Sequence, residues 1–164
     1  MINKDFEDFF RCLNKNRTEY LMVGGYAHIY YTEPRYTKDL DILINPTEKN
    51  SVRVHKSLCE FWGKNALGIQ PEHFTKKYPP GTCALGLGNP PNSIEIFTGL
   101  PGIDFQTAWK KRKSFKYGKI PVWVISADVL EKNFEAVKKI SPELEHKYAY
   151  FINELKKWRE YEKK

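Results

Sequence analysis

The sequence predicts an α/β (α+β) fold, a small mixed β-sheet flanked by helices, and three observations support this. Short apolar runs of strand length alternate with longer stretches that carry apolar residues at helical spacing. Two short runs, Asp39 to Ile44 and Ser93 to Phe97, alternate polar and apolar residues as half-buried strands do. Glycine and proline separate these segments. Because 164 residues suffice for one core but not two, a single domain over residues 1–164 is expected.

The first half of the chain predicts three helices and two strands. Lys4 to Asn14 has apolar residues at helical spacing, so it is expected to form the opening helix. Tyr20 to Val23 is a short apolar strand that ends at a Gly-Gly pair, and the helix after it must stop before Pro34. After the second strand, Asn45-Pro46-Thr47 provides a cap for a helix that runs to about Trp62.

The second half predicts a less regular region followed by helices. Residues 63–91 are rich in glycine and proline, with a short helix near Pro71 to Lys77 and a strand near Thr82 to Leu87. That strand and the segment through Phe97 form either a hairpin or two neighbouring strands. A C-terminal helical extension, 141–164, is expected to pack on the sheet. The remaining elements are a helix, a strand and two helices, over 101–113, 119–126, 127–140 and 142–164.

Composition favours a reducing compartment and a polyanionic partner. The three cysteines are odd in number and have no paired spacing, which argues against a disulfide framework and against structural zinc. A cytoplasmic location is therefore expected. The first residues include acids where a signal peptide would be apolar, and no apolar run is long enough to span a bilayer, so no membrane association is expected. The formal charge of +7 favours nucleotides or RNA.

Three carboxylates are candidates for a metal site. Asp39 and Asp41 are two apart in a strand, so they share one face and lie roughly 6.6 Å apart along it, a spacing that suits two metal ions. Glu95, in the other alternating strand, is the third candidate and is also a candidate base for an attacking hydroxyl. Mg²⁺, or alternatively Mn²⁺, is the expected cofactor, because it prefers oxygen ligands. The simpler alternative is a solvated strand face.

Gly24 and Gly25 end one strand and open a helix. In this arrangement the backbone amides and the helix N-terminus approach phosphate without an intervening side chain. A tight turn is the simpler alternative. A Gly-Gly turn or an Asp-x-Asp strand alone is common, but their combination is informative. His28 is the only histidine near this turn, and a packed or surface position is expected for it.

The segment VGGYAHIYYTEPRYTKDLDILI resembles the signature of the DNA polymerase beta-like nucleotidyltransferase superfamily, whose members pair a Gly-Gly or Gly-Ser turn with a downstream Asp-x-Asp strand. More narrowly, the chain resembles the bacterial minimal and toxin-type nucleotidyltransferases, where an Arg-x-Thr often precedes the aspartates, as Arg35-Tyr36-Thr37 does here. The later SIEIFTGLPGIDF resembles the strand that carries the third carboxylate and the turn after it. The resemblance covers Tyr20 to Ala136 in patches.

The resemblance implies a nucleotidyltransferase fold that moves a nucleoside monophosphate from a nucleoside triphosphate such as ATP to a hydroxyl acceptor and releases pyrophosphate. It implies that Asp39 and Asp41 hold the metal ions and that Glu95 holds the ion on the acceptor side. The residues that would bind the nucleotide or brace the strand are Gly24, Gly25, Arg35, Thr37 and Lys38. The acceptor stays open among RNA such as tRNA, a protein and a small molecule, and the basic charge favours RNA or a role in a toxin-antitoxin pair.

The sequence departs from the family pattern in two ways, and the second supports a rival interpretation. First, relatives commonly have Asp as the third carboxylate, where this chain has Glu95. Second, relatives carry an Asn-Lys pair and then a Lys-Asp pair near the C-terminus, and this chain keeps neither well. The first pair reads Asn133-Phe134 here, and His146 to Phe151 contains no aspartate. Lys132 is a weak substitute. The rival is a non-catalytic module of the same fold that binds a nucleotide or partner, such as an antitoxin or a regulatory protein. The three carboxylates oppose it.

The stretch from Trp109 to Lys119 mixes cations with aromatic residues. Such a mixture is able to bind RNA through phosphate contacts and stacking. A solvated helix end followed by a hairpin explains the same pattern and is the preferred interpretation.

Overall fold

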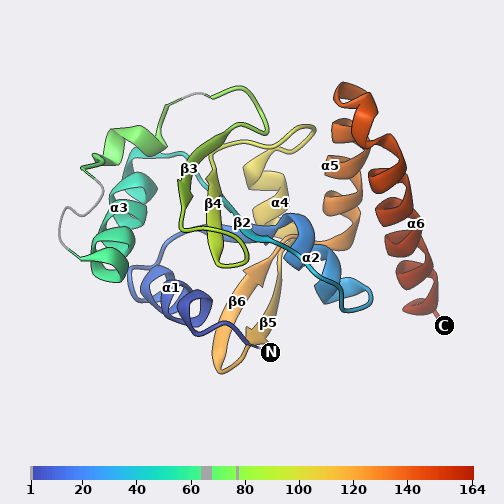
Figure 1. The fold of residues 1–164 in the computed structure, drawn as a ribbon, viewed down its shortest axis with the longest axis horizontal. Helices are drawn as coiled ribbons and strands as arrows, with labels where there is room; N and C mark the ends of the chain where they lie inside the picture. The colour runs from blue at the N-terminus through green and yellow to red at the C-terminus, as the bar shows by residue number, and fades with distance from the viewer. Residues whose placement is uncertain (1, 64–67, 77) are drawn as a thin grey trace.

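The structure is a computed structural model that describes residues 2–63, 68–76 and 78–164. In these residues six strands form one open mixed sheet with the order β3-β4-β2-β1-β6-β5 (Figure 1). The strands are β1 (Tyr20–Val23), β2 (Asp39–Ile44), β3 (Cys83–Leu87), β4 (Ser93–Phe97), β5 (Lys113–Tyr117) and β6 (Ile120–Val124). The α-helices are α1 (Lys4–Lys15), α2 (Gly24–Tyr31), α3 (Glu48–Trp62), α4 (Phe105–Lys111), α5 (Ala127–Ile140) and α6 (Glu145–Tyr161). The predicted α+β fold class is confirmed.

The register of the central strands brings the candidate site together. β2 is antiparallel to β1 and parallel to β4, while β1 is parallel to β6 and the outer strands form antiparallel pairs. Asp41 lies opposite Glu95 on β4 and opposite Val23 on β1. Since Gly24 follows Val23 directly, the glycine turn and two of the three carboxylates meet at one end of neighbouring strands.

Local sequence signals explain where the first helices begin. The Asn3 side chain accepts hydrogen bonds from the amides of Asp5 and Phe6 at the start of α1, and the Thr47 hydroxyl accepts one from Asn50 at the start of α3. The apolar stripe of α1 is fully buried, and α1 packs on α3. These residues join one hydrophobic core cluster that extends to Leu155 in α6.

The last two helices lie side by side at one edge of the molecule (Figure 1). α5 and α6 also contact α2, which lies against β1 and β2. A 3₁₀ turn, Pro142–Leu144, separates them at the predicted Ser141-Pro142 boundary. Glu131 of α5 is 2.9 Å from the Arg159 guanidinium of α6 and 3.8 Å from the Lys156 ammonium. The C-terminal pair therefore forms a wall beside α2.

The structure refines several predicted elements. The short helix expected near Pro71 to Lys77 is a 3₁₀ helix, Pro71–Phe74, and Lys77 lies outside the described residues. The region from Thr82 to Phe97 is a hairpin, the first of the two alternatives. Trp109 to Lys119 is the end of α4 followed by a hairpin that turns at Gly118, so the expected helix end and hairpin are both present. Among the described residues, no helix is long and apolar enough to cross a membrane.

Candidate active site

Asp39, Asp41 and Glu95 lie on one face of the parallel pair β2 and β4. Asp41 is directly opposite Glu95, and Asp39 is opposite Ser93, whose hydroxyl donates a hydrogen bond to the Asp39 carboxylate. Neighbouring strands are about 4.8 Å apart, so the three carboxylates occupy an area two strands wide and three residues long. All three line one cleft of about 540 Å³.

Burial and mutual repulsion perturb the acids of this cleft. Burial, followed by the charges of Glu95 and Asp39, raises the pKa of Asp41 to about 7. A hydrogen bond from the Gly25 amide and the nearby charge of Lys147 act in the opposite direction. Burial and the Asp39 charge also raise the pKa of Glu95. The ionised cluster is therefore electrostatically unfavourable until a cation neutralises it.

The carboxylates fit a magnesium site at which the protein supplies only some of the metal ligands. Among residues 2–63, 68–76 and 78–164, no three His, Cys, Asp or Glu side chains are grouped closely enough to hold a metal ion by themselves. Mg²⁺ usually takes only one or two carboxylates from the protein and keeps waters and substrate phosphates as its other ligands. A cluster of repelling oxygens that lines an open cleft matches this requirement, whereas a closed protein cage does not.

The glycine turn is in direct contact with the strand that carries the aspartates. Gly24 has φ +61°, and a Cβ there would lie 1.9 Å from Asp41 Oδ2. A Cβ at Gly25 would lie 2.6 Å from the Thr37 hydroxyl oxygen. Both positions thus require glycine for close approach, and Gly24 requires it also for its left-handed backbone. The tight turn is confirmed, and it brings the start of α2 onto Asp41.

A second cleft, of about 360 Å³, shares Gly24, Asp39 and Asp41 with the first. It is lined by every residue that the sequence assigned to nucleotide binding: Gly24, Gly25, Arg35, Thr37 and Lys38. The structure therefore brings all eight predicted site residues to two adjoining clefts. The opposite wall of both clefts comes from α5 and α6 and includes Phe134 and Tyr148.

Arg35 is held in the second cleft by α2 and α6. Its guanidinium carbon is 3.7 Å from the centre of the Phe151 ring, and its Nη1 is 3.5 Å from Glu154 Oε2. Its Nη2 contacts His28 Nδ1. Burial, with the Arg35 charge second, lowers the pKa of His28 to about 4, so the ring is neutral at pH 7.

The neutral ring has a defined role. His28 Nε2 is 3.1 Å from the Phe151 carbonyl oxygen, which is an acceptor, so the proton is on Nε2 and the Nδ1 lone pair faces Arg35. The side chain is fully buried, as expected for a packed histidine. His28 therefore orients Arg35 and is not positioned as a metal ligand.

Two further residues complete the clefts: Lys147, which the sequence did not single out, and Tyr148, for which helical spacing indicated only packing. Lys147 and Tyr148, in the first turn of α6, line both of them. Lys147 lowers the pKa of Asp41, while burial and the Asp41 charge raise the pKa of Tyr148. The sequence does contain a signal for Lys147. The apolar residues at helical spacing begin at Tyr148, which places Lys147 next to the face of the helix that packs.

Of the two positions considered earlier in α5, Asn133 lines the first cleft and Lys132 does not. Lys132 is exposed and does not line either cleft, so the weak substitute proposed from the sequence is not brought to the carboxylates. Asn133 is buried, and its amide donates a hydrogen bond of 2.9 Å to the Pro101 carbonyl. This bond fixes α5 to the turn that follows β4.

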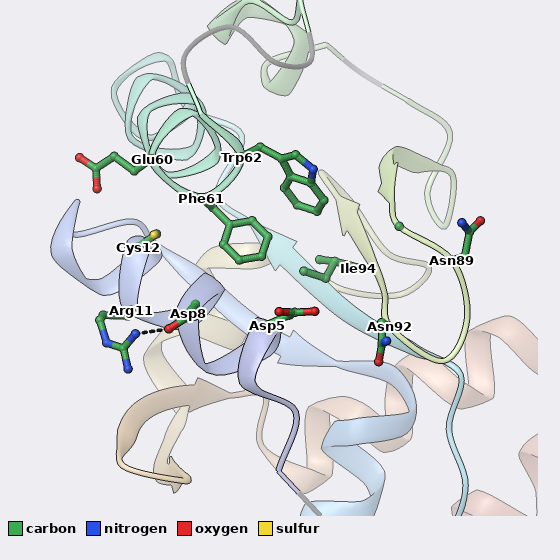
Figure 2. A pocket seen from close by; sticks show the side chains of 11 residues that line it. Asp5, Asp8, Arg11, Cys12, Glu60, Phe61, Trp62, Asn89, Asn92 and Ile94 are labelled. Atoms are coloured by element: carbon green, nitrogen blue, oxygen red, sulfur yellow. Dashed lines mark hydrogen bonds and ion pairs between the residues drawn. The ribbon is translucent and has the colours of Figure 1, made fainter.

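A larger cavity, of about 800 Å³, is lined by other residues, and Figure 2 shows them. It is enclosed by α1, the end of α3 and the turn between β3 and β4, with Asp5, Trp62 and Ile94 among its lining residues. Ile94 and Glu95 are consecutive in β4, so their side chains point to opposite faces. Trp62 lines this cavity, and residues 64–67, which come shortly after it in the chain, lie outside the described residues. We therefore assign no site to the cavity.

Comparison with known proteins does not add a family. No protein-family model matches the chain, and no curated protein matches its sequence. Function is therefore inferred from the residues and their geometry.

Proposed function

We propose that this chain is a Mg²⁺- or Mn²⁺-dependent nucleotidyltransferase of the DNA polymerase beta-like superfamily, similar to its toxin-type members. It would move a nucleoside monophosphate from a nucleoside triphosphate to a hydroxyl acceptor. The observation that carries the proposal is the meeting of three sequence segments in adjoining clefts. The glycine turn contacts Asp41, Glu95 lies opposite Asp41, and the segment from Arg35 to Lys38 lines the same space.

The second cleft has the chemistry expected for a triphosphate. Arg35 and Lys38 provide positive charge on one side, and Lys147 provides it on the other. The first turn of α2 contains no acidic residue, so its N-terminal partial positive charge is uncancelled by its own side chains. Together these groups favour a polyanion, with the aromatic rings of Tyr148 and Phe134 available beside it.

The carboxylates would divide their roles between the two metal ions. Asp39 and Asp41 would hold the ions, and Glu95 would bind the one on the acceptor side. When bound, divalent cations supply neutralisation of the cluster and Lewis-acid polarisation of the reacting phosphoryl group.

Glu95 is also the candidate base. Its pKa is raised by burial and by Asp39, so it is a better proton acceptor than an ordinary exposed carboxylate. In the proposed step the acceptor oxygen forms a bond to the α-phosphorus, the bond from that phosphorus to pyrophosphate breaks, and the acceptor proton passes to Glu95. Arg35 and Lys147 remain beside the departing negative charge.

The test is transfer of labelled nucleoside monophosphate in the presence of Mg²⁺ or Mn²⁺, with total cellular RNA, protein or small hydroxylated compounds as acceptors. Asp41→Asn should abolish transfer, whereas Glu160→Gln, which neutralises an exposed acid of α6, should not change it. A parent protein that binds nucleotide but transfers it to no acceptor would favour the non-catalytic binding module. The acceptor, the cytoplasmic location and a toxin-antitoxin role stay predictions from the sequence.

A further inference from the structure

A separate cleft, of about 410 Å³, lies at the other end of β1 from the carboxylates. Glu19 lines this cleft and directly precedes β1, whereas Gly24 follows β1 and lines the candidate active site. The two end residues of this four-residue strand are about 10 Å apart. The cleft gathers side chains from segments far apart in sequence, among them Arg17, Arg53, Trp109, Pro121 and Trp123.

Two indole rings in this cleft are fixed by an arginine. The rings of Trp109 and Trp123 have centroids 6.0 Å apart, and the Arg112 guanidinium carbon lies 3.8 Å from the first and 4.4 Å from the second. Arg112 also donates a hydrogen bond of 2.7 Å to the Trp109 carbonyl. Both indoles are half-buried, and the Phe105 ring stacks on Trp109 with centroids 5.8 Å apart, so Trp123 offers the more accessible ring face. The cation between them makes a preorganised aromatic surface.

Arg17 occupies a backbone conformation that arginine rarely adopts. It is exposed and has φ +53° in the turn between α1 and β1, where glycine or asparagine would be less strained. The turn itself does not need an arginine side chain. Arg53 reaches the same turn and donates a hydrogen bond of 3.0 Å to the Arg17 carbonyl. Two guanidinium groups are thus held in the cleft that the indoles line, one of them at a conformational cost.

The combination identifies the ligand class. Guanidinium groups bind phosphate, and unpaired bases stack on indoles. A single strand of nucleic acid has both phosphates and unpaired bases, so it can contact the arginines and the indoles together. A duplex buries the faces of its bases, and an acidic peptide has no planar bases for the indoles. The preference for phosphate is strengthened by exposed Lys116, which lies opposite Pro121 of this cleft on the adjoining strand β5.

We propose that this cleft binds single-stranded nucleic acid, with Arg17 and Arg53 on phosphates and the accessible indole surface of Trp123, held in place by Arg112 and Trp109, against a base. Binding at this place does not require the transferase reaction. The bound nucleic acid would also be the RNA acceptor for the site at the other end of β1, and this second statement alone rests on the proposed function.

The experiment measures the fluorescence anisotropy of a labelled single-stranded RNA of about 12 nucleotides with the full chain, without nucleotide or metal, from about 50 mM salt upward. Arg17→Gly removes the charge and relieves the backbone strain, so affinity should fall about tenfold while the melting temperature stays the same or rises. The slope of log affinity against log salt should decrease by about 0.7, which corresponds to one phosphate contact. Trp123→Leu should weaken binding about fivefold or more through lost stacking.

Matched variants separate this cleft from general basic charge. Arg17→Lys keeps the charge and should retain most of the affinity, whereas Lys157→Gln removes an exposed charge from α6 and should change it less than twofold. The proposal is overturned if the parent does not bind, or if Arg17→Gly and Trp123→Leu bind like the parent. It is also overturned if heparin or an RNA hairpin competes as well as the single strand. Because nucleotide and metal are absent, failure of transferase activity leaves this result unaffected.

Discussion

Replacing Asp41 with asparagine should stabilise the metal-free protein above neutral pH. The pKa of Asp41 is raised from its ordinary 3.8 to about 7 by burial and by Glu95 and Asp39. An acid with a raised folded-state pKa stabilises the folded protein while it is protonated. That contribution is fully present below about pH 4 and is lost as the pH rises through about 7.

The size of the effect follows from the same two values. The difference between 3.8 and about 7 is roughly three pKa units, or about 4 kcal/mol at 1.36 kcal/mol per unit. Asparagine has nearly the same shape, cannot ionise, and keeps an oxygen that accepts the Gly25 amide. The free energy of unfolding of Asp41→Asn should therefore exceed that of the parent by up to about 4 kcal/mol above pH 8, and match it near pH 4.

Urea unfolding of parent and variant across this pH range, in the presence of a chelator, measures the difference. Mg²⁺ added at pH 8 should stabilise the parent and have a smaller effect on the variant, because the variant lacks one of the repelling charges. Equal stability of the two proteins at every pH, or a less stable variant at pH 8, would refute the electrostatic reasoning.

Three further variants test individual contacts. Glu95→Gln should keep triphosphate affinity, measured by calorimetry, while transfer falls by roughly 10² or more, and equal losses of both would contradict a base on the acceptor side. Gly24→Ala should lower the free energy of unfolding by more than about 1 kcal/mol, because its Cβ meets Asp41 and its φ is +61°. Gly99→Ala, whose Cβ would have no neighbour within 4 Å, is the control. Lys147→Met should weaken triphosphate binding about tenfold with an unchanged melting temperature, and unaltered affinity would remove Lys147 from the site.

Short-range patterns predicted the centre of this fold well. The alternation in Asp39 to Ile44 and in Ser93 to Phe97 fixes which side chains leave the core, so the shared face of the three carboxylates followed from the pleat. The Gly-Gly pair marked the end of β1 because only glycine fits there. The direct opposition of Asp41 and Glu95 required the register, which the sequence alone does not contain.

Features that depend on long-range packing were not predictable. β5, with the sequence KSFKY, was expected only as part of a hairpin and without bounds. Its apolar face is limited to Phe115 and Tyr117, so its pairing with β6 determines where the strand begins and ends. Lys147 reaches the carboxylates only because α6 packs on α5 and α2. The arginine between Trp109 and Trp123 likewise depends on the contact of α4 with β6.

The most direct test of the central claim compares two labels on one nucleoside triphosphate. With Mg²⁺ and a mixture of RNA, protein and small-molecule acceptors, label at the α-phosphate should appear on an acceptor, and label at the γ-phosphate should leave as pyrophosphate. Both signals should disappear with Asp41→Asn. Transfer of the γ label, or α-label transfer that persists in Asp41→Asn, would contradict a nucleotidyltransferase built on these carboxylates.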